Sequence, residues 1–445
     1  MKKQIVFLLF IIHFISSSIV AQVRINTNFL DSIAYPIDTT FYVKRDFIPN
    51  ALFANANIIG LGEATHGTKE FYVIKDYIFR NQVLFNNVRA FAIESDFCGM
   101  VRFNNYLLDN SKTIQSLPQE FDSSGIYSIY YTKELYDLFE WIKSYNLKQI
   151  NNSDKIKVYG IDMQDPFSIS KYIIENYPSL KQEDSLAYLE LKNINNLYYP
   201  RREIKLKKKD IDKYIQLSDK LALLIKQNDE KKGDEILVRC IELLKQTFGL
   251  RYNNNQINQK KSFEPYSNAR DKYMADNCIW IYQQISQQKT NDSGKLIVWA
   301  HNGHVGFDSD NDINDINGIP MGYFISRKDN IKYCSLGFSF GEGEVRMFDF
   351  DGPVRKFRPF LYNPSQKKNS IEYWLKDVKY PVFIIPFNQP NSPEIENFFS
   401  INKYQRMIGA KHQGNEDKDY ISNPVNKSFN GIIFVRKGNS AESMN

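Results

Sequence analysis

The stretch NIIGLGEATHG, residues 57–67, places a short apolar run directly before a turn that holds an acid and a histidine. Three later segments have the same form, an apolar run that ends in polar or ionisable residues; they are residues 89–94, 156–162 and 295–301. Apolar runs of this length are typical of strands that are buried on both faces of a sheet. The four segments therefore predict four internal strands.

Helical patterns separate these expected strands. Residues 69–81 carry Phe71, Ile74 and Ile78 at spacings of three and four, which places these side chains on one face of a helix. Two more helices are expected ahead of the third and fourth strands, at residues 132–145 and 271–288. Strands that alternate with helices predict an α/β fold with a parallel or mostly parallel sheet covered by helices.

The chemically useful side chains fall at the ends of the expected strands. Ligands of open α/β sheets bind outside the carboxyl ends of the strands. One edge of the sheet would therefore gather six residues that are distant in the sequence: Glu63, His66, Glu94, Asp162, His301 and His304.

Histidine is scarce in this chain, and three of its five histidines lie in two turns, GEATHG and WAHNGHVG. Imidazole accepts a proton near neutral pH, and a neighbouring carboxylate fixes its tautomer and stabilises the imidazolium. The spacing of Glu63 and His66 therefore indicates a general base with an orienting acid. Glycine on both sides of this turn allows a sharp bend close to a ligand.

The chain also divides by composition. Residues 1–21 combine two lysines, an apolar run and small residues, which predicts a signal peptide cut after Ala21 and a protein that is periplasmic or secreted. Residues 22–165 and 263–436 are expected to form the two parts of the α/β core, the second with C-terminal strands. Residues 166–262, long and charged with regular Leu and Ile, predict a helical insertion that caps the site. Residues 437–445 are expected to be a frayed polar tail.

Charge and cysteine content narrow the classes of partner. The charges that make up the net charge of +6 are spread along the chain, so we expect no nucleic-acid-binding surface. After the signal peptide, no segment approaches the roughly 18 apolar residues of a membrane span. The four cysteines are far apart, and their spacing proposes no disulfide: Cys98, Cys240, Cys278 and Cys334.

Five motifs occur in an order and spacing that resemble the erythromycin esterase family. They are GLGEATHGTKEF, FAIESD, YGIDMQD, ARDKYMADN and VWAHNGHV, and Met321-Gly322 with residues 406–409 look like further landmarks, so the similarity covers roughly residues 57–435. The resemblance implies a three-layer α/β/α core with a mostly parallel sheet, a helical insertion and a mixed C-terminal part. It also implies hydrolysis of the macrolactone ester of macrolide antibiotics, and thus antibiotic resistance, with no metal and no cofactor.

The resemblance also implies roles for individual residues. The catalytic set, in the order of base, supporting acids, arginine and HN-x-H histidines, is His66, Glu63, Glu94, Arg270, His301 and His304. The carboxylate that holds His66 would be that of Glu63 or of Glu94. Arg270 with His301 or His304 would stabilise the tetrahedral oxyanion. Where many members carry an arginine, this chain has Lys75, which keeps the charge without the planar fork. We expect Lys75, Asp162 and Asn302 to contact the small-molecule ester.

A serine esterase is one alternative. Residues 337–341 match the G-x-S-x-G pattern with Ser339 as nucleophile. That pattern needs a helix after the serine and a histidine later in the chain. Here residues 342–348 predict a strand, and only His412 follows, which favours an ordinary strand and turn.

Two further alternatives use the same histidines and acids. His301 and His304 with Glu63 and Glu94 have ligand types that suit a metal or haem site. The cleft of a non-catalytic envelope protein could instead bind an ester or glycan without cleaving it. The acidic loop 308–315 lacks the glycine and the final glutamate of an EF-hand, which favours a solvated loop.

Overall fold

The central strands send successive side chains into two different cores. In β2 (Ile58–Leu61), Ile58 packs in one core and Ile59 in the other; in β5 (Lys295–Trp299), Val298 and Trp299 separate in the same way. Side chains alternate across a strand, so a strand that is apolar at every position needs a packed layer on each face. The predicted burial of these strands on both faces is confirmed.

The computed structural model describes residues 28–38, 52–198, 206–228, 230–231, 233–260, 264–286, 294–308, 318–349, 356–387, 393–410 and 416–444, and for residues 252–260 and 264–266 it describes the backbone alone. Three predicted features lie outside the described residues: the signal peptide, nearly all of the acidic loop 308–315, and His412.

A nine-stranded sheet has the order β1-β8-β11-β6-β2-β5-β3-β4, with β7 paired to β6. The remaining strands are β1 (Tyr35–Pro36), β3 (Val88–Asp96), β4 (Lys157–Asp162), β6 (Tyr333–Asp349), β7 (Lys356–Tyr362), β8 (Val382–Pro386) and β11 (Gly431–Gly438). From β11 to β4 each strand is parallel to its neighbours, whereas β1, β7 and β8 pair antiparallel. The mostly parallel sheet is therefore confirmed.

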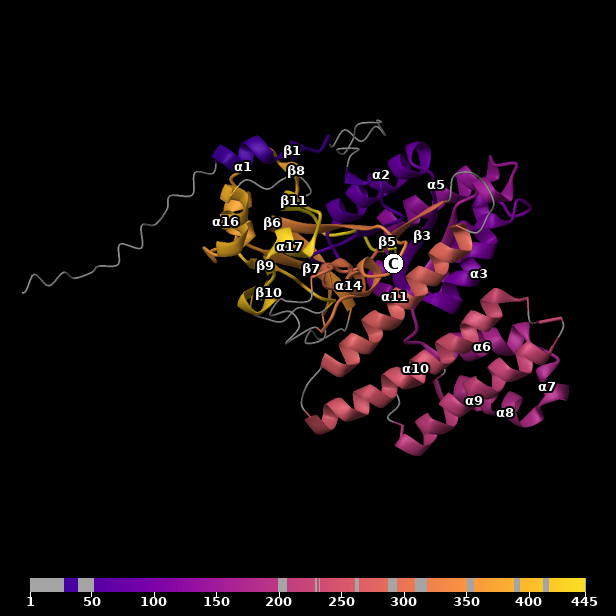
Figure 1. Cartoon of the computed structure of the whole chain (residues 1–445). Helices are drawn as coiled ribbons and strands as arrows, with labels where there is room; N and C mark the ends of the chain where they lie inside the picture. The colour runs from indigo at the N-terminus through magenta and orange to yellow at the C-terminus, as the bar shows by residue number, and fades with distance from the viewer. Residues whose placement is uncertain are drawn as a thin grey trace, which may run out of the picture.

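Helices cover both faces of this sheet (Figure 1). The core that holds Trp299 is closed by α2 (Lys69–Phe85) and α5 (Lys133–Leu147), and the opposite core by α11 (Glu264–Ser286) and α14 (Met321–Ser326). The helices predicted at 69–81, 132–145 and 271–288 are present; α2 extends to Phe85 and α11 begins earlier, at Glu264. Three layers result, as the fold class predicted.

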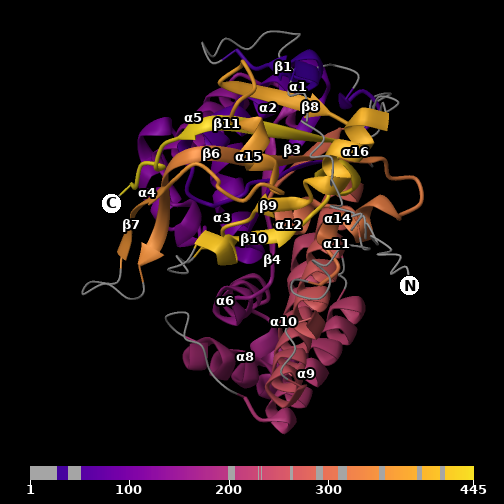
Figure 2. The ribbon, with the colours of Figure 1, turned by 90° about the vertical axis from the view of Figure 1, so that its left-hand side faces the viewer.

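The segment between β4 and α11 is helical where it is described. It contains α6 (Pro166–Asn176), α7 (Leu180–Glu183), α8 (Ser185–Tyr198), α9 (Lys208–Gln227) and α10 (Glu235–Lys260). These helices form a bundle at the bottom of both views (Figures 1 and 2). Arg251 of α10 donates a hydrogen bond to the carbonyl of Gln164 (3.3 Å), so the bundle reaches the segment that follows Asp162. Its role as a cap stays a prediction.

The other elements are short and lie around the sheet. They are α1 (Asn28–Ile33), α3 (Phe97–Leu108), α4 (Leu117–Asp122), α12 (Asn302–Val305), α15 (Ile371–Leu375), α16 (Pro393–Ile401), α17 (Val425–Ser428), and a separate pair of strands, β9 (Tyr404–Arg406) and β10 (Tyr420–Ser422). All four cysteines are buried and free, and the sulfurs of Cys98 and Cys240 lie 2.9 Å apart between α3 and α10. Within the described ranges, no helix has the length and apolar character that crossing a membrane requires.

The expectation of a frayed tail from residue 437 is wrong. Strand β11 continues to Gly438, and the backbone beyond it is bonded to the start of α2 and α5. Asn439 accepts a hydrogen bond from the backbone of Lys69 (2.8 Å), and Ala441 donates one to the carbonyl of Gly67 (2.9 Å). We predicted fraying from the polar side chains of this segment. The hydrogen bonds that hold it are made by backbone groups, which every residue has whatever its side chain.

Candidate active site

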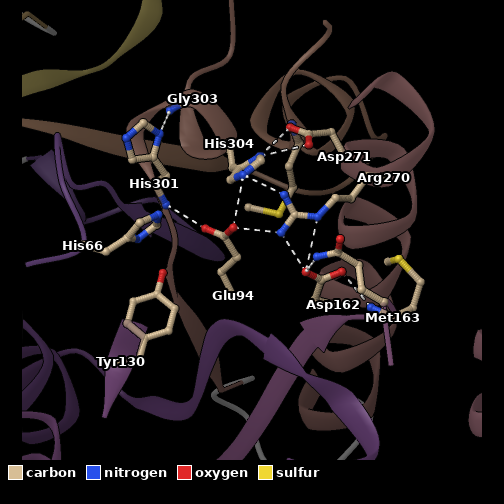
Figure 3. Close-up of polar contacts among 12 residues, drawn as sticks. His66, Glu94, Tyr130, Asp162, Met163, Arg270, Asp271, His301, Gly303 and His304 are labelled. Atoms are coloured by element: carbon tan, nitrogen blue, oxygen red, sulfur yellow. Dashed lines mark hydrogen bonds and ion pairs between the residues drawn. The ribbon is translucent and has the colours of Figure 1, made fainter. Parts of the chain in front are cut away.

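Four adjacent strands deliver the predicted side chains to one edge of the sheet. Glu63, His301, Glu94 and Asp162 lie at the carboxyl ends of β2, β5, β3 and β4, which are neighbours in this order. Arg270 reaches the same edge from α11. Figure 3 shows Glu94 at the centre, with His66, His301 and Tyr130 to one side and the charged residues of α11 to the other. The structure thus brings together side chains separated by up to 238 residues, from Glu63 to His301.

Glu63 binds three side chains, which form the base cluster. Its Oε1 lies 2.6 Å from Nδ1 of His66 and accepts a hydrogen bond from the Tyr130 hydroxyl (3.0 Å), while its Oε2 accepts one from Lys75. The Tyr72 hydroxyl donates to the backbone carbonyl of His66 (2.7 Å). Both the ring and the backbone of His66 are therefore fixed.

The charges of this cluster set the tautomer of His66. Burial alone would raise the pKa of Glu63, but the Lys75 ammonium and the hydrogen bond to His66 lower it to about 2. Glu63 is thus a carboxylate at neutral pH, and the nitrogen that faces it, Nδ1, carries the proton. No side chain in the described part of the chain bonds to Nε2 of His66, whose lone pair can accept a proton.

A second set of residues, the ionic cluster, surrounds Glu94. The Arg270 guanidinium donates to Oδ2 of Asp162 (2.6 Å) and to Oε1 of Glu94 (2.8 Å). Nδ1 of His304 lies 2.9 Å from both carboxylate oxygens of Asp271, and its Nε2 lies 3.2 Å from Oε1 of Glu94. Every one of these side chains faces an opposite charge.

The ionic cluster holds His304 in its charged form. Burial by itself would lower the pKa of His304, but the carboxylates of Asp271 and Glu94 raise it to about 10. Burial would likewise raise the pKa of Glu94, and the charges of His304 and Arg270 hold it well below its usual range. Nη1 of Arg270 lies 3.2 Å from Nε2 of His304. Both nitrogens of an imidazolium are donors, so this is a contact between two cations. The carboxylates of Glu94, Asp162 and Asp271 offset the repulsion between them.

His301 lies between the two clusters with a different protonation. The backbone of Gly303 donates to its Nδ1 (3.2 Å), so the hydrogen of the neutral ring is on Nε2. Burial, reinforced by the charges of His66 and His304, lowers the pKa of His301 to about 4. Its Nε2 is buried without a hydrogen-bond partner among the described residues, and its ring centroid lies 5.3 Å from that of His66. A buried donor without an acceptor is costly, which points to an acceptor on a ligand.

The three residues predicted to contact substrate are buried and bonded to the protein. Lys75 and Asp162 have no exposed surface, and they hold Glu63 and Arg270. Asn302 is 1% exposed; its side chain donates to the carbonyl of Phe338 (2.7 Å) and accepts from its amide (3.0 Å). Their polar atoms have partners within the fold, and substrate contact by these residues stays a prediction.

Sequence reasoning missed two members of the site. Asp271 directly follows Arg270 in the motif ARDKYMADN, and that adjacency was the signal that could have found it. Tyr130 lies in a segment without hydrophobic periodicity, ahead of α5, and only the tertiary structure brings it to Glu63.

The structure bears on two alternative functions, a serine esterase and a metal-binding protein. Ser339 lies in the middle of the single long strand β6, is fully buried and donates to Glu372 (2.6 Å), so the strand-turn-helix elbow of a serine esterase is not formed. Across the ranges that the structure describes, no group of three or more His, Cys, Asp or Glu side chains is arranged to hold a metal ion.

Comparison with known proteins identifies a family. The sequence pattern of the family described as "Erythromycin esterase" matches residues 85–438, beginning after the turn that carries His66. The erythromycin esterase type II of Escherichia coli is 22% identical over 441 residues, covering 89% of this chain and 93% of that protein.

Solved structures share the fold. A Bacillus cereus protein superposes with a TM-score of 0.76 at 22% identity, covering 94% of this chain and 98% of that one. A mutant of the erythromycin esterase EreC in its open conformation has a TM-score of 0.67 at 17% identity, with coverage of 89% and 94%. The α/β fold of this chain is therefore shared with both of these solved structures.

Proposed function

Because this chain belongs to the erythromycin esterase family, we propose that it is a hydrolase that cleaves a carboxylic ester with His66 as general base. One observation carries the proposal: Nδ1 of His66 is bonded to the buried carboxylate of Glu63 at 2.6 Å, which leaves Nε2 to accept a proton. A base that is oriented by an ionised acid is the arrangement that water activation requires.

The proposed reaction needs no covalent enzyme intermediate. Nε2 of His66 takes a proton from water while the water oxygen bonds to the ester carbonyl carbon. The tetrahedral intermediate then expels the alkoxide by breaking the C–O bond, and the alkoxide takes the proton from His66. The products are a carboxylic acid and an alcohol, and Glu63 stabilises the transient imidazolium.

His301 is the proposed donor to the oxyanion. It is neutral near pH 7, and its buried Nε2–H lacks an acceptor among the described residues. Donors that are fixed before the reaction stabilise the charge that develops in the transition state. The ionic cluster holds the backbone of His301 in place, since its amide donates to Oε2 of Glu94 (3.0 Å).

The test is hydrolysis by purified protein. Erythromycin and a panel of simple esters are incubated with the wild-type chain and with His66→Ala, and products are measured by mass spectrometry. We expect addition of one water to at least one ester by the wild type alone. Equal product with His66→Ala would reject His66 as the base, and no product from any ester would reject the esterase assignment.

We also propose that the protein is exported. Residues 1–21 have the composition of a signal peptide, with two lysines, an apolar run and small residues at the end. Expression in a Gram-negative host, fractionation and N-terminal sequencing of the product test it. A mature protein beginning at Gln22 outside the cytoplasm is expected, and an uncut cytoplasmic protein would contradict it.

A further inference from the structure

A cavity of about 790 Å³ adjoins the segment that leads to Tyr130. It lies between that segment and the paired strands β6 and β7. Two of its lining residues are cationic, three are aromatic and none is acidic; the lining is Ile126, Tyr127, Ser128, Tyr131, Arg346, Lys356, Phe357 and Ser443. Such a lining suits a ligand that combines negative charge with apolar surface.

Arg346 is the unusual member of this lining. It is only 6% exposed, and its guanidinium carbon lies 3.9 Å from the centroid of the Phe357 ring. Its guanidinium donates to the backbone carbonyls of Ile129 (3.2 Å), Ser128 (3.4 Å) and Tyr131 (3.5 Å), while its Nε has no hydrogen-bond partner. No carboxylate of the described residues forms an ion pair with Arg346, and Glu134 acts on it only from a longer distance. A buried cation without a counter-charge is costly, so a site that retains one is suited to bind an anion.

Two arginines elsewhere in the fold are paired with acids. Arg270 faces the carboxylates of Asp162 and Glu94, and Arg406 lies 3.5 Å from Glu416. Arg346 instead has Lys356 on the wall of the same cavity, so the other charged residue of the lining has the same sign. Its Nε is therefore open to an anion that enters the cavity.

The wall of the cavity is bonded to the residues that hold the base. The backbone of Arg346 donates to the carbonyl of Gly67 (3.0 Å), the residue after His66. The carbonyl of Ile129 accepts from Arg346 and from the Tyr72 hydroxyl (3.4 Å), and that hydroxyl also donates to the His66 carbonyl. The wall of the cavity is thus joined by hydrogen bonds to the turn that carries His66.

We propose that this cavity binds an anionic group of the substrate, a carboxylate or phosphate held by Arg346 and Lys356, with an apolar portion against Tyr127 and Phe357. The inference rests on the proposed esterase function and narrows its substrate to esters that also carry a negative charge. Arginine binds carboxylate and phosphate through paired N–H donors, and Lys356 adds a second positive charge.

Matched substrates test the charge. Monoethyl adipate is anionic and diethyl adipate is its neutral counterpart, and kcat/KM is measured for each. We expect the wild type to prefer the anionic ester, and Lys356→Gln or Arg346→Gln to lower the ratio of the two kcat/KM values about 10-fold or more, the effect of losing one hydrogen bond to a charged group. Lys379→Gln, an exposed lysine beyond the cavity, is the control and should leave the ratio unchanged. A ratio that no variant changes would overturn the proposal.

A binding measurement separates this proposal from the esterase function. The monoethylamide of adipic acid, an anionic analogue that resists cleavage, is titrated calorimetrically into His66→Ala with and without Lys356→Gln. Loss of affinity of about 10-fold with Lys356→Gln supports the anion site even if no ester is hydrolysed, a result that would reject only the esterase. If neutral esters are hydrolysed and the affinity for the monoethylamide is the same with and without Lys356→Gln, the esterase function is retained and the anion site is rejected.

Discussion

His66 and His304 occupy the same edge of the sheet but use their ring nitrogens differently. Nδ1 of His66 is hydrogen-bonded to a single carboxylate, that of Glu63, and its Nε2 has no partner in the described structure. His304 commits both nitrogens, one to Asp271 and one to Glu94. The first histidine can exchange a proton with a ligand, whereas the second keeps its proton and stabilises the fold.

The number of acids around each ring accounts for this difference. Lys75 partly neutralises the carboxylate that faces His66, while two carboxylates face His304 and raise its pKa to about 10. A single carboxylate that is paired with an ammonium leaves the second ring nitrogen of His66 open to a ligand, whereas two carboxylates hold His304 as a fixed cation. Four substitutions test this difference between His66 and His304.

His66→Ala has the largest expected effect. The variant removes the only ring with an uncommitted accepting nitrogen in the base cluster, so kcat should fall by about 10³- to 10⁴-fold. Steady-state hydrolysis of the best ester measures it. Circular dichroism should show an unchanged fold, and an active His66→Ala beside an inactive but folded His304→Gln would reverse the comparison.

His301→Asn should have the next largest effect. Asparagine can still cap α12, which His301 now caps by accepting from Gly303, but it cannot place a donor where Nε2–H lies. We expect kcat to fall by about 10²- to 10³-fold with KM and melting temperature nearly unchanged. An unchanged kcat would remove His301 from the reaction.

His304→Gln should act mainly on stability, in a way that depends on pH. The pKa of His304 in the fold, about 10, lies above its ordinary value of 6.5. Its contribution to stability is therefore fully present below pH 6.5 and is lost as the pH rises to about 10. The variant should unfold more easily than the wild type at pH 6, and the difference should shrink toward pH 10.

Urea unfolding at several pH values measures this difference. Between the two pKa values the folded wild type holds one extra proton, which corresponds to a slope of at most about 1.4 kcal/mol per pH unit in the free energy of unfolding relative to the variant. A difference that does not vary with pH would show that His304 is not held as a cation.

Tyr130→Phe should have the smallest effect. The substitution removes one of the hydrogen bonds to Glu63 and keeps the ring that packs edge-on against His66, with centroids 5.5 Å apart. A loss of about 0.5–1.5 kcal/mol, or roughly 2- to 10-fold in kcat, is expected. Measurement beside His66→Ala under the same conditions ranks the two, and a Tyr130→Phe loss as large as that of His66→Ala would assign the proton transfer to the tyrosine.

Much of the fold could be predicted because its strands have a simple pattern. An uninterrupted apolar run such as residues 296–300 is stable only inside a sheet covered on both faces, and a turn that follows it must lie at the sheet edge. The Glu63–His66 pair is also local in sequence, with a spacing that lets the two side chains meet. These features depend on neighbouring residues and are visible in one sequence.

Long-range pairing could not be predicted in the same way. Glu94 meets Arg270 and His304 only because β3 and α11 fold together, and no local spacing reports that contact. Lys75 is a partial exception: it shares a helix face with the buried Phe71 and Ile78, a position typical of burial, yet its match to an arginine of the family led us to expect a substrate contact. A charged residue in an apolar stripe is better interpreted as one half of a buried ion pair.

The hydrogen bond from Ala441 to the carbonyl of Gly67 has a consequence for biosynthesis. The turn that orients His66 is completed by a segment made nearly four hundred residues later. A nascent chain that has not yet been extended to residue 441 lacks that segment, and its turn lacks this hydrogen bond. Catalytic competence would then begin only after the late segment has been synthesised and has packed against the turn.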